Sequence, residues 1–313
     1  MRLEKSAGPP RFRDYSAPGY WLPWMFIGLI KAFSFLPMQV CWLLGAITGE
    51  VVYRIHRTPT IKTNVRMCFP EKSEKERARF VRKYYREISY SFYCLGLAWF
   101  GSNRRLRKLA KLVGHEHCRK ALEAGRNVIL LAPHTVAMEV GGIRLAMDQP
   151  AMYLYSKPQN ELIHEAIYYY RTRHSGVGIA RFDSLRPLLK EMKNGLPFYY
   201  LPDQDPDRST MDYVFVPFMG VPAATFTAPA RMAKIAKAVV LPCYSKQLPF
   251  GKGFEFIIKP PMENFPTGDA ELDARRINAE MEKIIEDMPE QYLWSYRRFK
   301  TRPDNAPSPY IRK

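Results

Sequence analysis

His134 and Glu139 are the residues whose types and spacing first suggest chemistry in this chain. They lie in the segment NVILLAPHTVAMEVGGIR, residues 127–144, where an apolar run precedes the histidine and a helical pattern follows it. Five residues of helix turn through about 500°, so the two side chains cannot meet within one regular helix. If His134 lies in the turn before the helix, one ring nitrogen can bond to Glu139 while the other faces a cleft. Gly141 and Gly142 would permit close approach of another backbone or an acyl chain.

This arrangement predicts that His134 is a general base and Glu139 its orienting partner, as needed to deprotonate a hydroxyl nucleophile. A histidine in a turn followed by a surface glutamate would give the same pattern. The pair by itself therefore leaves both interpretations open.

Two arginines and two aspartates are candidates for substrate binding. Arg171 and Arg173 follow an apolar and aromatic stretch near a helix end, where a guanidinium could hold a phosphate or stabilise an oxyanion. Asp203 and Asp205 come just after the apolar run FYYL and Pro202. Ligand-binding residues collect at the carboxyl ends of strands in open α/β sheets. An ion pair between Arg171 and one of these aspartates is the alternative.

Apolar runs that alternate with helical stretches must position these residues. Strands are predicted at 127–132, 151–155, 198–201, 239–244 and 253–259, and helices at 73–100, 104–113, 136–147, 161–173, 185–193 and 270–288. Ser73 and Glu76 form a capping-box pattern at the start of the first helix. The alternation predicts an α/β fold with a mostly parallel central sheet flanked by helices.

The N-terminal segment 20–49 is hydrophobic, with Lys31 as its only charged residue. As a helix, the uncharged run 32–49 would be about 27 Å long, at the lower edge of what spans a bilayer. Pro37 would kink it, so a spanning helix, a re-entrant segment and a surface-lying helix pair all remain open, beside a buried core helix. We expect a tail and membrane-attachment segment over 1–57 and an α/β domain over 58–313.

Composition points to an anionic partner. A hydrophobic content of 47% excludes a disordered chain, and the formal net charge of +18 suits an anionic membrane, an acidic carrier protein, a phosphorylated substrate or nucleic acid. The five cysteines are scattered, without metal-ligand spacing, and are interpreted as free thiols in a reducing compartment. No pattern indicates a bound metal or redox cofactor.

Several longer segments carry a resemblance to a known family. They are NVRMCFPEKSEKER at 64–77, HTVAME at 134–139, PDQD at 202–205, VFVPFMGVPAAT at 214–225 and PEQYLWSYRRFKTRP at 289–303. With the hydrophobic N-terminus, they resemble the late acyltransferases of lipid A biosynthesis, the lauroyl and myristoyl transferases of Gram-negative inner membranes. That family is part of the wider glycerol-phosphate-acyltransferase-like group with an H-x4-D/E motif.

The resemblance implies an acyl carrier protein thioester as donor substrate, no bound cofactor, and a hydroxyacyl chain of a lipid A precursor with Kdo sugars as acceptor. It implies catalysis by His134 and Glu139, and it matches Arg171 to the family's R-x-R element and Asp203 to the first aspartate of P-D-x-D. Pro206 follows that element here in place of a glycine-containing turn. The implied location is the bacterial inner membrane, with the catalytic domain facing the cytoplasm and against an anionic membrane surface.

Other functions are compatible with parts of the sequence. The acceptor could be another membrane glycolipid. The chain could also be a basic, membrane-tethered nucleic-acid-binding protein or an inactive scaffold, although no nucleic-acid-binding module surrounds the basic and aromatic tail. Because the last two functions need no base, both predict that His134→Ala leaves function intact.

Overall fold

The computed structural model describes residues 8–56, 59–180, 185–206 and 212–310. Its helices are α1 (Trp21–Phe33), α2 (Met38–Ile55), α3 (Pro59–Cys68), α4 (Glu74–Phe100), α5 (Asn103–Leu109), α6 (His115–Glu123), α7 (Met138–Ala146), α8 (Glu161–Thr172), α9 (Leu185–Lys193), α10 (Ala228–Ala236) and α11 (Ala270–Asp287). Its strands are β1 (Ala110–Val113), β2 (Asn127–Leu131), β3 (Met152–Tyr155), β4 (Val177–Ala180), β5 (Phe198–Tyr200), β6 (Tyr213–Phe218), β7 (Val221–Phe226), β8 (Ala238–Leu248) and β9 (Gly253–Ile258).

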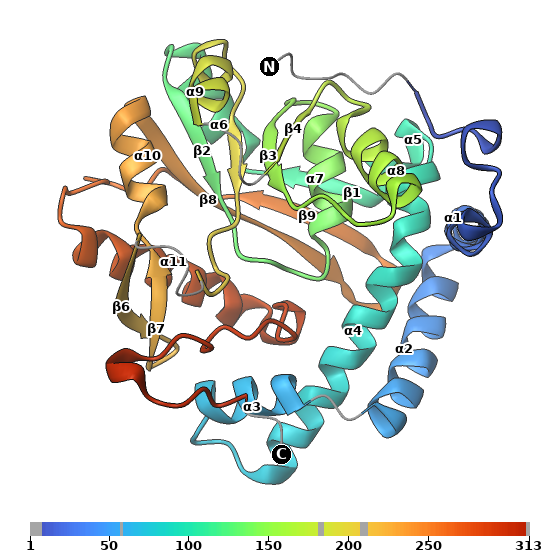
Figure 1. The fold of residues 1–313 in the computed structure, drawn as a ribbon, viewed down its shortest axis with the longest axis horizontal. Coiled ribbons are helices and arrows are strands. Elements are labelled where there is room, and N and C mark those ends of the chain that lie inside the picture. Colours follow the sequence, from blue (N-terminus) through green and yellow to red (C-terminus); the bar gives the residue numbers. More distant parts are fainter. Residues whose placement is uncertain (1–7, 57–58, 181–184, 207–211, 311–313) are drawn as a thin grey trace.

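A seven-stranded sheet forms the centre of the molecule, with the strand order β1-β9-β8-β2-β5-β3-β4 (Figure 1). Neighbouring strands are parallel except for the antiparallel pair β8 and β9. A separate antiparallel hairpin, β6 and β7, packs against α11. The expected α/β class and mostly parallel sheet are therefore confirmed.

Strand β2 shows why the central strands read as continuous apolar runs. Ile129 and Leu131 belong to one buried cluster, whereas Val128 and Leu130 belong to another. Alternate side chains of a strand point to opposite faces. Both faces of β2 are therefore covered, and its carboxyl end is held firmly by the packing on either side.

The long helix α4 begins as expected. The Ser73 hydroxyl accepts a hydrogen bond from the backbone N–H of Glu76 at 3.3 Å, and the Glu76 carboxylate accepts one from the backbone N–H of Ser73 at 2.7 Å. This reciprocal cap satisfies two N–H groups that an α-helix leaves unpaired at its start. Helix α4 then runs beside α2 and ends at Phe100, close to α8 (Figure 1).

One expectation about the elements needs correction, and one hairpin was not expected. The predicted basic helix over 104–113 ends at Leu109, and residues 110–113 form the edge strand β1, which pairs with β9. The residues of β1 alternate in exposure, as expected for a strand. This alternation decides the structure there against the helix that the basic amphipathic pattern predicts. The β6–β7 hairpin was not predicted, because Pro217 and Pro222 interrupt its apolar runs.

The N-terminal hydrophobic segment folds as two helices that separate before Pro37. Helix α2 turns Met38, Cys41 and Gly45 inward, and it packs along α4. No helix within the described residues is long and apolar enough to cross a bilayer, so the expected N-terminal membrane helix or re-entrant segment is unconfirmed. The expected boundary between 1–57 and 58–313 falls at residues 57 and 58, outside the described residues.

Candidate active site

His134 lies in the turn between β2 and α7, as the sequence predicts. The strand ends at Leu131, the helix begins at Met138, and the His134 carbonyl accepts a hydrogen bond from the backbone N–H of Leu293 at 3.0 Å. The imidazole edge meets the ring of Tyr296, with centroids 4.9 Å apart and planes at 87°. The C-terminal segment therefore helps to fix the position of the histidine.

The partner of His134 is Asp203, not Glu139. The ring Nδ1 lies 2.5 Å from Asp203 Oδ1, and the backbone N–H of His134 donates to Oδ2 at 2.8 Å. Strand β5 is the parallel neighbour of β2, so the residues that follow the two strands emerge at the same edge of the sheet. The sequence placed Asp203 at the end of a strand but contained no signal for which strand lies next to it.

This pairing fixes the charge of Asp203 and the orientation of the ring. Burial alone would raise the pKa of the Asp203 carboxyl, but the charge of His134 and its two hydrogen bonds outweigh burial and hold that pKa below its usual value. An ionised Asp203 favours the tautomer with hydrogen on Nδ1. In that tautomer, Nε2 carries a lone pair and can accept a proton. This nitrogen has no hydrogen-bond partner among the described residues.

Glu139 bonds to Arg171. Arg171 Nε donates to Glu139 Oε2 at 2.9 Å and Nη2 donates to the same oxygen at 2.6 Å, while Trp99 Nε1 donates to Oε1 at 3.0 Å. Burial would raise the pKa of Glu139, but Arg171 and Trp99 outweigh it and lower that pKa. The alternative ion pair of Arg171 with Asp203 or Asp205 is therefore not formed.

Arg173 and Asp205 hold chain segments in place. Arg173 Nη1 and Nη2 donate to the backbone carbonyls of Trp99 and Ala98 at 2.6 and 3.0 Å, which joins the end of α8 to the end of α4. Asp205 accepts from the backbone N–H and the hydroxyl of Thr301, both at 2.8 Å. Neither side chain lines the pocket beside His134, and their role in substrate binding stays a prediction. Residues 207–211, which continue the P-D-x-D loop, lie outside the described residues.

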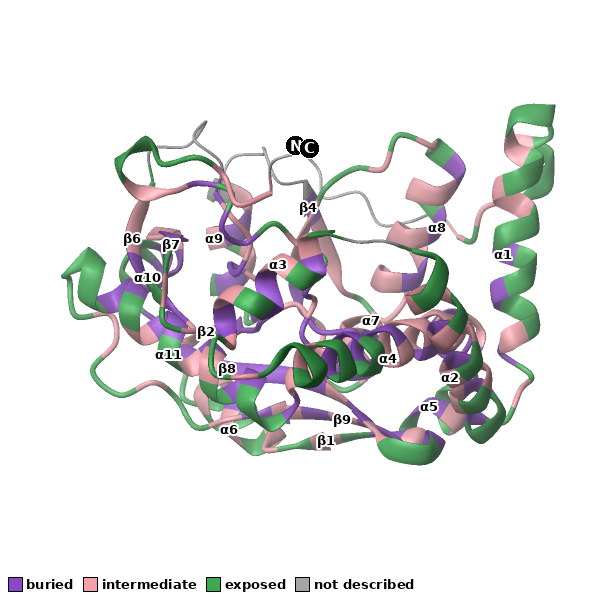
Figure 2. Ribbon diagram, turned by 90° about the horizontal axis from the view of Figure 1, so that it is seen from below, coloured by how far each residue is buried: buried purple, intermediate pink, exposed green. Residues whose placement is uncertain are grey.

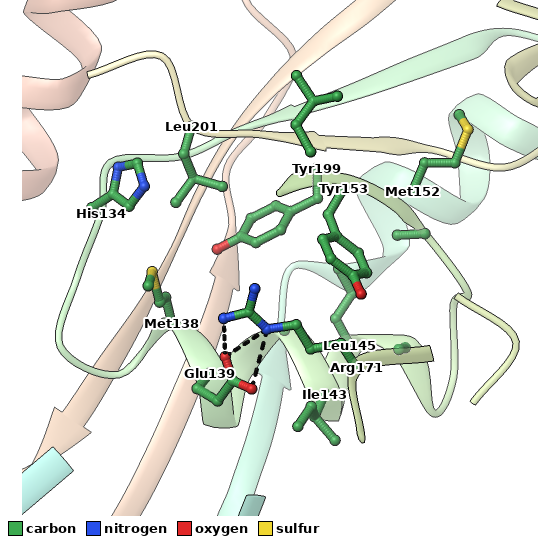
Figure 3. Close-up of a pocket in the computed structure, with 14 residues that line it drawn as sticks. His134, Met138, Glu139, Ile143, Leu145, Met152, Tyr153, Arg171, Tyr199 and Leu201 are labelled. Atoms are coloured by element: carbon green, nitrogen blue, oxygen red, sulfur yellow. Dashed lines mark hydrogen bonds and ion pairs between the residues drawn. The ribbon is translucent and has the colours of Figure 1, made fainter. Parts of the chain in front are cut away.

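A pocket that is mostly apolar extends from His134 along α7 and β3 (Figure 3). It is lined by His134, Met138, Glu139, Gly142, Ile143, Leu145, Ala146, Ala151, Met152, Tyr153, Leu154, Arg171, Tyr199 and Leu201. In Figure 3, His134 lies on one side of it, and the bonded Glu139 and Arg171 lie near Met138. The pocket therefore brings together His134, Glu139 and Arg171, with Asp203 behind the histidine.

The two glycines of α7 have different surroundings. A Cβ on Gly141 would lie 1.8 Å from the Ser245 hydroxyl oxygen, so this glycine allows the helix to pack on β8. A Cβ on Gly142 would meet only the ring of Tyr199, at 3.9 Å, and would point into the pocket. Only Gly142 therefore provides open space at the site.

Sequence reasoning did not identify Trp99, Tyr153 and Tyr199 as site residues. Tyr153 and Tyr199 line the pocket from β3 and β5, where they are register partners, and Trp99 reaches Glu139 from the end of α4. Only the strand order could have brought the two tyrosines together. Within the described residues, no group of three or more His, Cys, Asp or Glu side chains could hold a metal ion.

Comparisons with known proteins report on the family of the chain. The family model described as "Bacterial lipid A biosynthesis acyltransferase" matches residues 9–301. The "Lipid A biosynthesis lauroyltransferase" of Escherichia coli (strain K12) is 35% identical over 296 residues, which cover 94% of this chain and 96% of that protein. The "Lipid A biosynthesis palmitoleoyltransferase" of the same strain is 31% identical over 302 residues, covering 96% and 97%. The strain's "Lipid A biosynthesis myristoyltransferase" is 27% identical over 314 residues, covering 97% and 95%.

Proposed function

The chain belongs to the bacterial lipid A biosynthesis acyltransferase family, and we propose that it transfers a fatty acyl group from an acyl carrier protein thioester to a 3-hydroxyacyl chain of a lipid A precursor that carries Kdo sugars. Family membership makes it an acyltransferase of lipid A biosynthesis. The finer proposal is supported above all by one observation, the His134–Asp203 pair beside an apolar pocket.

In the proposed reaction, His134 Nε2 removes the proton of the acceptor hydroxyl while that oxygen attacks the thioester carbonyl carbon. Asp203 keeps the ring in the required tautomer and stabilises the imidazolium that forms. When the tetrahedral intermediate collapses, the carbon–sulfur bond breaks and the imidazolium returns its proton to the leaving thiolate. No bound cofactor takes part in these steps.

We assign Glu139 a positioning role through Arg171. The carboxylate compensates the charge of the guanidinium and holds it at the pocket through two hydrogen bonds. This arrangement keeps a cation next to the reacting thioester without leaving an unpaired charge in a mostly buried position.

The apolar part of the pocket is the proposed acyl slot. Ile143 and Leu145 of α7 and Met152 and Leu154 of β3 are among the apolar residues that line it. Each methylene of an acyl chain that leaves water for such a slot contributes about 0.8 kcal/mol. Donor chain length is then set by where the slot closes.

We propose that the N-terminal helices attach the enzyme to the bacterial inner membrane, with the catalytic domain facing the cytoplasm. Both helices carry exposed residues along their length (Figure 2). The large apolar ones among them are Leu22, Met25 and Leu29 on α1, and Val40, Leu43, Ile47, Val51 and Ile55 on α2. Such faces suit a helix pair that lies at the membrane surface. The net charge of +18 would attract both anionic headgroups and an acidic carrier protein.

The proposal is tested with the purified enzyme, an acyl carrier protein thioester and a Kdo-bearing lipid A precursor. His134→Ala should lower turnover by about 10²- to 10⁴-fold, because a positioned general base contributes that much, while the far-UV spectrum and Tm stay close to those of the wild type. Turnover within a few-fold of wild type would exclude His134 as the base. Mass spectrometry of lipid A from cells lacking the chain distinguishes this acceptor from another membrane glycolipid.

Membrane attachment has its own test. High salt alone should leave the protein on membranes, whereas detergent should release it, because apolar contacts are not screened by salt. Replacing the exposed Leu43 and Ile47 by Glu should make the protein extractable with salt. Release of the wild-type protein by salt alone would contradict the proposed apolar contact.

A further inference from the structure

Two tyrosine hydroxyls in the pocket lack hydrogen-bond partners. The hydroxyl groups of Tyr199 and Tyr153 are buried, and neither has a partner among the described residues. The Tyr199 residue is only 8% exposed. A buried polar group without a partner costs about 1–3 kcal/mol. A phenol left in this state beside a catalytic histidine suggests that its partner is a substrate.

The sheet directs both tyrosines into the same pocket, but it places their hydroxyls differently. The two residues are register partners on β3 and β5, so their side chains leave the same face of the sheet. Figure 3 shows the Tyr199 hydroxyl on the side of His134 and Met138, whereas the Tyr153 hydroxyl lies on the opposite side of the pocket. Of the two, Tyr199 is the one aimed at the region where His134 acts.

Packing fixes the ring of Tyr199 in this position. The ring lies against Phe256, with centroids 5.9 Å apart, and its Cε1 edge faces the space that the absent side chain of Gly142 leaves open. A rigidly placed donor loses little entropy when it engages a developing charge. The geometry is therefore that of a preorganised donor.

Two neighbouring side chains already direct nitrogen donors to carboxylates. Arg171 uses Nε and Nη2 for Glu139, and His134 Nδ1 is held by Asp203. The Tyr199 hydroxyl also remains protonated, since burial, and then the nearby Cys243 and Asp203, raise the pKa of this phenol well above its usual value. Tyr199 can therefore donate a hydrogen bond at neutral pH.

We infer that Tyr199 donates its phenolic hydrogen bond to the thioester carbonyl oxygen as that oxygen becomes an anion. The inference rests on the proposed function. His134 takes the hydroxyl proton as the new carbon–oxygen bond forms, and the π electron pair of the carbonyl moves onto the oxygen that Tyr199 faces. The phenol keeps its proton throughout. When the carbonyl re-forms, the carbon–sulfur bond breaks, and the thiolate takes the proton from the imidazolium.

The test is Tyr199→Phe in the full-length enzyme, assayed with the acyl carrier protein thioester and the lipid A precursor. Loss of one oxyanion donor should lower kcat by about 10²- to 10³-fold. KM for the thioester should change by less than about threefold, because the bond strengthens only in the transition state. Tm should stay level or rise, since the variant removes a buried oxygen that has no partner.

Tyr90→Phe is the matched control. Tyr90 is a buried tyrosine of α4 that stacks on Phe254, outside the pocket. This variant should keep wild-type kcat. A kcat within threefold of wild type for Tyr199→Phe would overturn the inference, and so would a fall in Tm that accompanies the loss of kcat. Failure of the proposed function looks different, because the wild-type enzyme itself would then transfer no acyl group.

Discussion

The site holds two pairs of a carboxylate with a nitrogen-bearing side chain, and the pairs differ in what the nitrogen partner can do. His134 and Asp203 meet through Nδ1, and Arg171 and Glu139 meet through Nε and Nη2. An imidazole gains and loses a proton near neutral pH, whereas a guanidinium stays charged. The His134–Asp203 pair can therefore move a proton in each turnover. The Arg171–Glu139 pair can only supply a fixed charge and keep the neighbouring side chains in position.

The comparison also shows how far apart in the chain such partners can be. His134 and Glu139 are neighbours in the sequence, yet His134 bonds to a residue 69 positions away and Glu139 to one 32 positions away. The H-x4-E spacing thus belongs to two separate pairs that act on one pocket. Variants of the His134–Asp203 pair should report on proton transfer, and variants of the Arg171–Glu139 pair should report on positioning.

The largest effect is expected at the proton-moving pair. Asp203→Asn should lower kcat by about 10³- to 10⁴-fold, because an amide cannot stabilise the imidazolium and can favour the wrong tautomer. Asp205→Asn, which weakens the contacts with Thr301 away from His134, should cost less than about tenfold. Steady-state kinetics of both variants test this, and equal losses would remove the distinction between the two aspartates.

Disrupting the Arg171–Glu139 pair should lower the stability of the protein as well as its activity. Arg171→Ala leaves the buried Glu139 carboxylate without its cation and should cost about 3–5 kcal/mol of unfolding free energy. Glu139→Ala should lower turnover by on the order of 10²-fold, because Arg171 loses its orientation.

The double variant Arg171→Met, Glu139→Gln separates these two effects. It should recover most of the stability lost in Arg171→Ala, because no buried charge remains, but little of the activity. Denaturant unfolding and turnover measured on the same samples decide the matter. Full activity in the double variant would show that the fixed charge is dispensable.

A smaller effect on donor chain length is expected from changes in the proposed acyl slot. Gly142→Met should shift donor preference toward shorter acyl chains, since overpacking costs about 1–3 kcal/mol. The control is Gly141→Ala, whose Cβ would collide with Ser245 and which should therefore lose stability without a selective shift. The measurement is the donor-length profile across acyl carrier protein thioesters. An unchanged profile in an active Gly142→Met enzyme would exclude this part of α7 from the slot.

The smallest effect concerns pH. Since Arg171 holds the pKa of Glu139 below its usual value, the pair stabilises the fold above about pH 4.5, and this contribution is lost as pH falls through the lowered pKa. The Tm of the wild type should therefore drop more steeply below about pH 4.5 than the Tm of Glu139→Gln. Parallel pH curves for the two proteins would contradict the assigned pair.

Local sequence patterns were sufficient for the elements that position the site. The Ser73 cap, the buried run 127–131 and the helix after His134 depend on neighbouring residues, and the structure confirms them. The edge strand β1 was missed because its pairing with the distant β9 overrides a helical pattern. The N-terminal run was ambiguous for a similar reason, because its inward face is defined by its packing against α4 and the turn at residues 249–251.

By itself, the sequence determined that His134, Asp203 and Arg171 would lie near the carboxyl ends of strands and the ends of helices, because strand and helix periods are local properties of the chain. Only the tertiary structure decided which carboxylate meets which cation. That choice depends on β5 lying beside β2, which brings Asp203 to the histidine, and on α8 packing against α7, which brings Arg171 to Glu139. Lateral order of strands and helices follows from the packing of the whole core, and no spacing between His134 and Glu139 encodes it.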